Sequence, residues 1–178
     1  MAPLRPGDAV VDLGCAPGGW LQVLAERVGG RGLVLGVETR PVEPLGGCVR
    51  LLELDFTSPA APQRIAEELG REATAVFCDA APRLSGIRDV DRAALEEIHA
   101  AALAVCERVL RPGGRLVLKG FPGPASEGVR QELRRRFERV TEVRPQATRR
   151  GSREFYWVAT GTPRRLSPRR RTRRGTRA

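Results

Sequence analysis

The sequence predicts an α/β fold in which a mostly parallel, seven-stranded sheet carries helices on both faces. Short apolar runs alternate with helical patterns along the first 160 residues, as expected for strands joined by crossover helices. A second observation is the glycine-rich turn at residues 14–19, directly after the first apolar run. With 178 residues, of which 41% are hydrophobic, the chain can form one domain with a sizeable core. We expect this domain over residues 1–162 and a short tail over 163–178.

Each element follows from a local pattern. Apolar runs rich in Val and Leu predict strands at residues 9–13, 33–37, 49–52, 73–78, 116–119, 140–143 and 155–160. Helical periodicity predicts helices at residues 20–28, 62–69, 91–110 and 127–137. Gly29 and Gly30 end the first helix. The Arg-Pro-Gly-Gly sequence at 111–114 is expected to end the third helix and to turn the chain into the fifth strand.

The turn after the first strand predicts a cofactor site. Its glycines let the backbone approach a ligand with no Cβ in the way, and the helix that follows offers its positive N-terminal end. The spacing differs from the G-x-G-x-x-G of dinucleotide-binding proteins. We expect Trp20 to pack at the helix start rather than to stack on a base. The candidate residues of this turn are Asp12, Gly14, Pro17, Gly18, Gly19 and Trp20.

Acidic residues at the next two strand ends narrow the choice of cofactor. Glu38 ends the second strand and Asp55 follows the third. Such a set suits a cofactor with ribose hydroxyls and an adenine amine but no pyrophosphate, and S-adenosylmethionine fits this description. We expect Glu38 to contact the ribose and Asp55 the adenine end. Each acid alone is equally consistent with a solvated loop residue, and it is the occurrence of three features at three successive strand ends that favours the cofactor.

The single lysine is a candidate catalytic residue. Of the 31 Lys and Arg residues only Lys119 is a lysine, and it ends the fifth predicted strand. Arginine stays charged at any usable pH, whereas a desolvated lysine can act as a base. Function gathers at the carboxyl ends of strands in α/β sheets. The alternative is the chance survival of one surface lysine.

The sequence resembles the FtsJ/RrmJ-like ribose 2′-O-methyltransferases that act on ribosomal RNA. The resemblance extends from Leu4 to Gly161 and rests on four ordered motifs. These are Asp-Leu-Gly-Cys-Ala-Pro-Gly-Gly-Trp at 12–20, Cys-Asp-Ala-Ala-Pro-Arg-Leu-Ser-Gly at 78–86, Leu-Arg-Pro-Gly-Gly at 110–114 with Val-Leu-Lys at 117–119, and Ser-Arg-Glu-Phe-Tyr-Trp-Val-Ala-Thr-Gly at 152–161. The implied fold is the Rossmann-like fold of S-adenosylmethionine-dependent methyltransferases.

The resemblance also implies roles for three residues. The family that this sequence resembles uses a Lys-Asp-Lys-Glu tetrad. By this resemblance, its Asp, second Lys and Glu correspond to Asp79, Lys119 and Glu154. Lys119 would take the proton of a ribose 2′-hydroxyl while the two carboxylates hold and orient it. Asp79 is also expected among the cofactor-binding residues. Taken alone, Asp79 could cap a loop and Glu154 could pair with Arg153 or Arg149.

The first lysine of the tetrad has no counterpart in this sequence. In the family it lies on a helix upstream of the Pro-Gly that precedes the first strand, here Pro6-Gly7, and residues 1–5 contain no lysine. Three functions therefore stay open. The favoured one is methyl transfer to a ribose 2′-hydroxyl, most plausibly in 23S ribosomal RNA. The second is a catalytically weak or inactive RNA-binding protein on the same scaffold, and the third is a small-molecule methyltransferase, against which the Lys119, Asp79 and Glu154 set argues.

The net charge of +10 indicates a partner rich in phosphate, but most of it lies in the tail. Residues 164–178 contain eight arginines and no acid, so the rest of the chain carries only +2. The tail, with little apolar content, is expected to be disordered and either to contact phosphates or simply to be solvated. Ribosomal RNA or the large ribosomal subunit is the expected partner. Further candidates for an RNA groove are Arg83, Arg88, residues 134–136, Arg149, Arg150 and Arg153.

The cysteine and histidine residues indicate which cellular compartment and which metal sites to expect. The four cysteines are scattered and no apolar stretch could form a leader or span a bilayer. We therefore expect free thiols in a cytoplasmic, non-membrane protein, and a monomer. The one histidine, His99, falls in a helical pattern. It is expected to be an ordinary helix residue rather than a ligand, and no metal site is expected.

Overall fold

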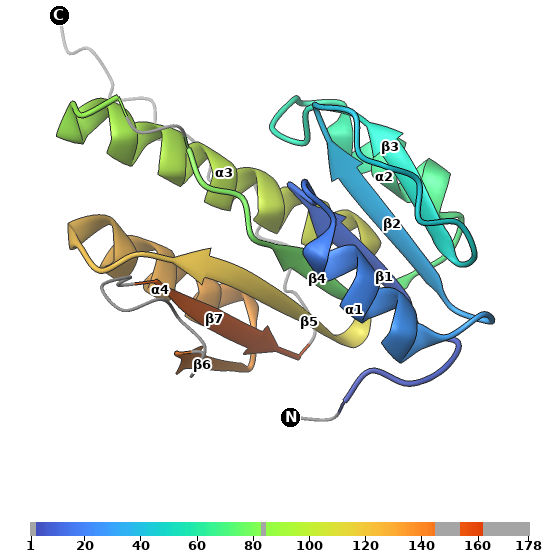
Figure 1. Cartoon of the computed structure of the whole chain (residues 1–178). Coiled ribbons are helices and arrows are strands. Elements are labelled where there is room, and N and C mark those ends of the chain that lie inside the picture. Colours follow the sequence, from blue (N-terminus) through green and yellow to red (C-terminus); the bar gives the residue numbers. More distant parts are fainter. Residues whose placement is uncertain (1–2, 83–84, 145–153, 162–178) are drawn as a thin grey trace, which may run out of the picture.

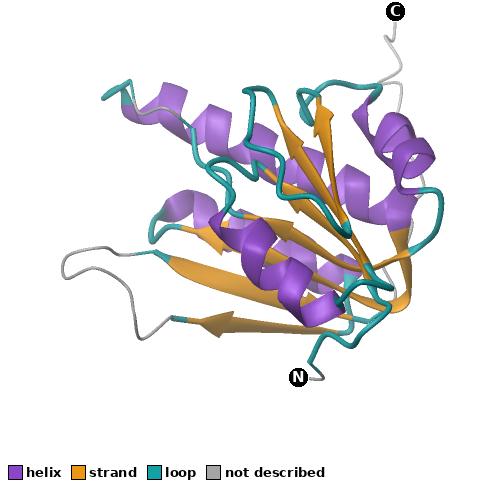
Figure 2. Ribbon diagram, turned by 45° about the vertical axis from the view of Figure 1, so that its right-hand side comes forward, coloured by secondary structure: helices purple, strands orange, loops and turns teal. Residues whose placement is uncertain are grey.

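The computed structural model shows a seven-stranded sheet with helices on both faces (Figures 1 and 2). It describes residues 3–82, 85–144 and 154–161. The strand order across the sheet is β3-β2-β1-β4-β5-β7-β6. The α/β fold class with a mostly parallel seven-stranded sheet is confirmed. Because the order reverses beside β1, the crevice at its carboxyl end is the expected place for a ligand.

The elements follow the predicted order. The strands are β1 (Ala9–Leu13), β2 (Leu33–Glu38), β3 (Val49–Glu53), β4 (Ala73–Cys78), β5 (Leu110–Gly120), β6 (Arg139–Val143) and β7 (Phe155–Thr160). The helices are α1 (Gly19–Val28), α2 (Ala61–Leu69), α3 (Arg88–Val109) and α4 (Pro124–Arg136).

The two faces of the sheet have separate cores. Along β1, Val10 belongs to the core that includes α1 on one face, while Val11 belongs to the core that includes residues of α2, α3 and α4 on the other. This alternation follows from the two-residue period of a strand. Figure 1 shows α1 in front of the sheet and α2, α3 and α4 behind it. Every residue of β1 is buried, and each fully buried Val or Leu stabilises the fold by roughly 1.5–3 kcal/mol relative to an exposed one.

Strand β7 runs antiparallel to both of its neighbours. It lies between β5 and β6, with Lys119 of β5 paired to Tyr156 and Val143 of β6 paired to the same residue. Reversal of this strand places its first residues at the edge where the parallel strands end. Glu154, which immediately precedes β7, is thereby brought to the carboxyl end of β5.

Three elements begin three or more residues earlier than predicted. Strand β5 begins at Leu110, because Leu110 pairs with Ala73 before the register shifts and Arg115 pairs with Ala75. The residues at 111–114 are therefore an irregular segment within a strand rather than a separating turn. Helix α3 begins at Arg88, with acidic residues in its first turn that suit its positive end. Helix α4 begins at Pro124, and proline favours the first turn of a helix because its missing N–H is not needed there.

None of the helices in the described ranges is sufficiently long and apolar to cross a lipid bilayer.

Candidate active site

The predicted glycine turn brings β1, β2 and the segment after β4 close together. Gly14 has φ +73°, a left-handed conformation, and a Cβ at this position would lie 2.7 Å from the Cβ of Ala80. Only glycine fits both the backbone angle and the close approach. The Gly14 N–H donates to the Val37 carbonyl at 2.9 Å. Gly18, with φ +111°, caps the start of α1.

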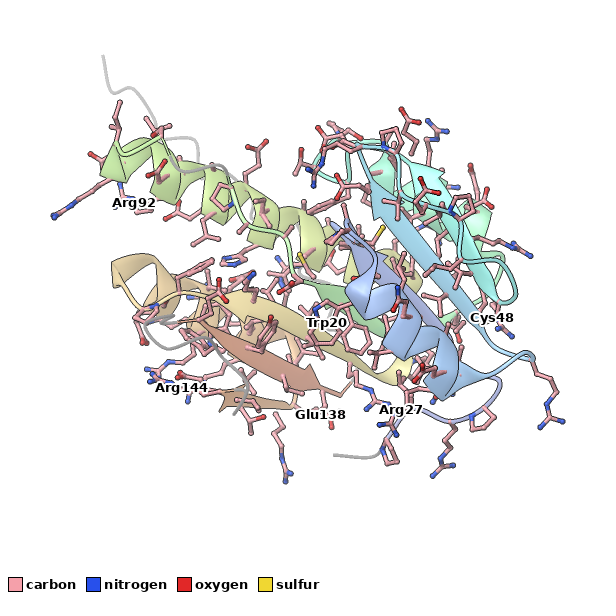
Figure 3. All side chains as sticks on the ribbon, viewed as in Figure 1. Trp20, Arg27, Cys48, Arg92, Glu138 and Arg144 are labelled. Carbon is pink, nitrogen blue, oxygen red and sulfur yellow. The ribbon has the colours of Figure 1, made fainter. Side chains whose placement is uncertain are left out.

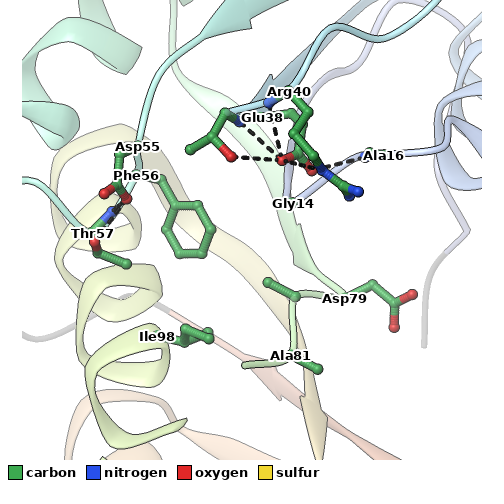
Figure 4. A pocket seen from close by; sticks show the side chains of 12 residues that line it. Gly14, Ala16, Glu38, Arg40, Asp55, Phe56, Thr57, Asp79, Ala81 and Ile98 are labelled. Carbon is green, nitrogen blue, oxygen red and sulfur yellow. Dashed lines mark hydrogen bonds and ion pairs between the residues drawn. The ribbon is translucent and has the colours of Figure 1, made fainter. Parts of the chain in front are cut away.

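A cavity of about 540 Å³ lies beside this turn at the carboxyl edge of the sheet (Figure 4). Its size is within the usual range for small-molecule sites. Four predicted residues meet there from four places in the chain: Gly14, Glu38, Asp55 and Asp79. The remaining lining residues are Ala16, Thr39, Arg40, Phe56, Thr57, Ala80, Ala81 and Ile98.

Glu38 is held by backbone donors on both sides of the cavity entrance. Its Oε2 accepts from the Ala16 N–H at 3.2 Å, and its Oε1 accepts from the N–H groups of Thr39 at 2.9 Å and Arg40 at 3.4 Å. Figure 4 shows these bonds converging on the carboxylate. Burial alone would raise the pKa of Glu38, but these hydrogen bonds outweigh it, so the pKa is lowered from 4.5. Glu38 is therefore ionised and fixes the glycine turn to the end of β2.

Asp55 and two apolar side chains line the opposite side of the cavity (Figure 4). The Asp55 Oδ1 accepts from the N–H of Thr57 at 2.9 Å and from its hydroxyl at 2.7 Å. Phe56 and Ile98 give this side an apolar surface. An acid next to an apolar wall suits a purine ring with an exocyclic amine.

Asp12 is a buried acid with unusual surroundings. Its side chain is fully buried, and among the described residues neither carboxylate oxygen has a hydrogen-bond partner. Burial, reinforced by the charges of Asp79 and Glu38, raises the pKa of Asp12 from 3.8 to about 7. Burial of a carboxyl group without a hydrogen-bond partner is unfavourable. Asp12 lies two residues before Gly14, so a bound ligand could supply the missing donor.

The other turn residues do not line the cavity. Asp12, Pro17, Gly18, Gly19 and Trp20 are absent from its wall, so their assignment to the cofactor stays a prediction. Trp20 lies where α1 meets the sheet (Figure 3), with its ring 5.5 Å from that of Phe77 and 5.9 Å from that of Tyr156. This agrees with packing at the helix start.

The three residues matched to the tetrad meet at the end of β5. Lys119 Nζ lies 3.2 Å from Asp79 Oδ1 and 3.6 Å from Glu154 Oε1. The lysine side chain is only 13% exposed, against 30% for Asp79 and 37% for Glu154. Asp79 also lines the cavity. The catalytic roles themselves stay predictions.

Tyr156 is a site residue that the sequence reasoning missed. Its hydroxyl donates to Asp79 Oδ1 at 2.6 Å. Burial, followed by the bond to Asp79, raises the pKa of Tyr156, so the phenol stays protonated. Tyr156 is two residues after Glu154, and the period of a strand puts both on one side. The two-residue spacing between Glu154 and Tyr156 was the feature of the sequence that could have identified Tyr156 as a site residue. The ring of Phe121 lies 5.9 Å from Lys119 Nζ, close enough for a weak cation–π contact.

The arginines proposed for an RNA groove are only partly described. Arg136 forms ion pairs with Glu107 and Glu132, and Arg135 pairs with Glu132 at 3.3 Å. These two residues of the 134–136 run are thus engaged within the helical layer, which favours the interpretation as a helix face. Arg83, Arg149, Arg150 and Arg153, and the tail at 163–178, lie outside the described residues. In the part of the chain that is described, no cluster of three or more His, Cys, Asp or Glu could hold a metal ion.

The fold defines the class of protein. Strand order, the reversed β7 and the glycine turn are those of the Rossmann-like fold of S-adenosylmethionine-dependent methyltransferases. The structure is similar to that of a Plasmodium falciparum protein described as a ribosomal RNA methyltransferase, with a TM-score of 0.77, 21% identity and coverage of 91% of this chain and 90% of that one. It is also similar to Aeropyrum pernix fibrillarin with bound S-adenosyl-L-methionine, with a TM-score of 0.63, 15% identity and coverage of 90% and 69%. At these identities the likeness establishes the fold.

The sequence defines the family within this class. The model of the FtsJ-like methyltransferase family matches residues 1–162. The chain therefore belongs to the FtsJ-like methyltransferases, and the predicted resemblance is confirmed.

Two curated relatives are named ribosomal RNA large subunit methyltransferase E. The protein of Methanothrix thermoacetophila is 44% identical over 155 residues, which cover 87% of this chain and 60% of that protein. The protein of Alkalilimnicola ehrlichii is 43% identical over 159 residues, which cover 89% of this chain and 76% of that protein. The chain thus spans three fifths to three quarters of these relatives' lengths.

Proposed function

We propose that this chain transfers a methyl group from S-adenosylmethionine to a ribose 2′-hydroxyl of large-subunit ribosomal RNA. The observation that carries the proposal is the meeting of Lys119, Asp79 and Glu154 beside the 540 Å³ cavity. The names of the relatives support the choice of ribosomal RNA.

The residues of the cavity fit the cofactor. Asp12 is fully buried and does not itself line the cavity, but its carboxyl has no hydrogen-bond partner in the described part of the chain; we assign to it a donor such as the amino group of the methionine part. Glu38 and Asp55 suit the ribose hydroxyls and the adenine amine, and Gly14 keeps the turn open to a ligand. When bound, S-adenosylmethionine supplies an electrophilic methyl group whose bond to sulfur breaks, the electron pair remaining on a neutral thioether.

The protein's part in the reaction is alignment and proton uptake. Lys119 Nζ would contact the 2′-oxygen and accept the proton that this oxygen loses as its bond to the methyl carbon forms. Asp79 and Glu154 keep the lysine amine in place by charge-assisted hydrogen bonds. Tyr156 fixes Asp79 in turn.

Single-turnover methylation of 23S ribosomal RNA and of 50S particles tests the proposal. Lys119→Arg should bind S-adenosylmethionine as tightly as the wild type, measured by calorimetry. Its transfer rate should fall on the order of 100-fold to 10,000-fold, because arginine cannot take up the proton and its planar group displaces the hydroxyl. Arg92→Lys, on an exposed part of α3, is the matched control for exchanging one cation for another and should retain the wild-type rate.

The position of the new methyl group is checked by alkaline hydrolysis, which needs a free 2′-hydroxyl and therefore leaves a gap at a 2′-O-methylated nucleotide. A ladder without a gap in methylated RNA would place the methyl group on a base and contradict the proposal. Equal rates for wild type and Lys119→Arg would remove Lys119 from the mechanism. Cofactor binding without transfer to either substrate would favour the RNA-binding alternative.

A further inference from the structure

His99 links helix α3 to the end of β5. Its side chain is only 2% exposed, and its Nε2 lies 3.0 Å from the backbone carbonyl oxygen of Lys119. The edge of its ring packs against Trp157 of β7, with ring centroids 5.7 Å apart and an interplanar angle of 81°. One buried side chain therefore contacts two strands that contribute to the site.

The hydrogen bond can be assigned a direction. A carbonyl oxygen only accepts, so Nε2 must carry the proton. Nδ1 is then an acceptor, and within the described residues this buried atom has no hydrogen-bond partner. A second proton on Nδ1 would create a buried charge without an acceptor, and burial lowers the pKa of His99 from 6.5 accordingly. The neutral ring with its proton on Nε2 is the form that fits this place.

The ends of the strands explain why Lys119 accepts from a side chain. The pairing of β4 with β5 stops at Cys78 and Leu118, one residue before Lys119. No residue of β4 is therefore paired with Lys119, while β7 pairs with it on the other side through Tyr156. A partly buried carbonyl at such a strand end needs another donor, and His99 provides it.

The backbone after Lys119 is confined from the same direction. A Cβ at Gly120 would lie 2.7 Å from the Phe155 ring and 2.8 Å from the Trp157 ring. Trp157, which touches His99, is thus also packed against Gly120. Movement of His99 would free both the carbonyl of Lys119 and the ring that confines the next residue.

We propose that His99 is a positioning residue for Lys119, acting through the hydrogen bond to its backbone carbonyl. The inference rests on the proposed function for its effect on rate. The carbonyl orientation fixes the direction of the Lys119 side chain, and with it the place of Nζ between Asp79 and Glu154. A misplacement of about 1 Å in an aligned site costs about 100-fold in rate.

The single lysine makes this position observable without turnover. Because Lys119 is the only lysine of the 178 residues, selective ¹³C labelling of the lysine Cε gives one cross-peak, which reports the surroundings of Nζ. His99→Leu removes the donor and keeps an apolar side chain, while His99→Gln keeps an N–H donor at similar reach. Val105→Ala, at a fully buried position on the same helix, is the matched control for lost packing.

Three results are expected together. The Lys119 cross-peak moves in His99→Leu and stays near its wild-type position in His99→Gln and Val105→Ala. The single-turnover rate at saturating cofactor falls about 10-fold to 100-fold in His99→Leu only. The affinity for S-adenosylmethionine stays within about twofold in all variants. If His99→Leu does not fold, His99→Met takes its place, since methionine adapts to irregular cores.

The outcomes separate this inference from the proposed function. An unmoved cross-peak in a folded His99→Leu or His99→Met would overturn the positioning role, as would an equal loss of rate in Val105→Ala. If the wild type transfers no methyl group but the cross-peak moves in His99→Leu and not in His99→Gln, the proposed function fails and the positioning role stands.

Discussion

Asp12→Asn should remove a pH-dependent component of the free energy of unfolding. Asp12 is fully buried without a partner in the described part of the chain. Burial is the main reason that its pKa is raised from 3.8 to about 7, with smaller effects of Asp79 and Glu38. Asparagine has the same shape and no charge, so the variant does not titrate at this position.

The sign follows from proton binding. Unfolded, this aspartate loses its proton near pH 4, whereas the folded chain keeps the proton up to about pH 7. Between these values the folded state binds more protons, so the free energy of unfolding contributed by Asp12 falls as the pH rises and is level above about pH 7. A shift from 3.8 to about 7 corresponds to roughly 4 kcal/mol at about 1.36 kcal/mol per unit. About 3 kcal/mol of this is lost between pH 5 and pH 8.

Urea unfolding at pH 5 and pH 8, followed by circular dichroism, measures this loss. The wild type minus Asp12→Asn difference should drop by about 3 kcal/mol between the two pH values, since the titrations of His99 and Glu38 largely cancel in it. Asp89→Asn is the matched control, because the Asp89 side chain is 87% exposed. The wild type minus Asp89→Asn difference in the free energy of unfolding should be the same at pH 5 and pH 8. Parallel pH profiles for wild type and Asp12→Asn would refute a raised Asp12 pKa.

Three further predictions concern the ligands. Glu38→Ala should weaken S-adenosylmethionine binding by roughly 1–3 kcal/mol, the cost of leaving buried donors unpaired, and unchanged affinity in calorimetry would contradict the role of Glu38. Gly14→Ala should destabilise the fold by about 1–3 kcal/mol and lower the affinity for S-adenosylmethionine, because the new Cβ would lie 2.7 Å from that of Ala80. Gly128→Ala is the control, because a Cβ at this position meets nothing within 4 Å. It should neither destabilise the fold nor lower the affinity for the cofactor. Removal of residues 163–178 should lower RNA affinity and flatten its dependence on salt while cofactor binding is kept; an unchanged slope would mean that the tail is merely solvated.

The sequence was most informative where structure is local. Runs such as Val10-Val11 and Val34-Leu35 show buried strands directly, since only strands covered on both faces are apolar at consecutive positions. Gly14 and Gly18 indicated a turn that other residues cannot form, and both have positive φ. The predicted start of β5 was wrong, because the sequence Arg-Pro-Gly-Gly is typical of turns. Pairing of Leu110 with Ala73, a tertiary contact, extends the strand across it.

The site shows the same division. Asp79 and Lys119 each follow or end an apolar run, so a parallel sheet places both at the same edge, and the family resemblance predicted that they meet. Tyr156 and His99 became site residues only through distances across the fold, to Asp79 and to the Lys119 carbonyl. Nothing near His99 in the sequence shows that β4 ends one residue short of Lys119. Likewise, the raised pKa of Asp12 depends on burial in the fold and on the charges of two other acids.

The place of β7 in the sheet makes the order of synthesis relevant to this protein. Among the described strands β7 comes last in sequence, yet it lies between β5 and β6, and Glu154 comes just before it. A growing chain contains Asp79 and Lys119 well before it contains Glu154, and until residues 155–160 are made β5 has no partner on that edge. Such an edge can pair with foreign strands, and pairing across a long stretch of sequence is slow. Emergence of β7 from the ribosome therefore protects the sheet from aggregation and, in the same step, completes the carboxylate pair around the lysine.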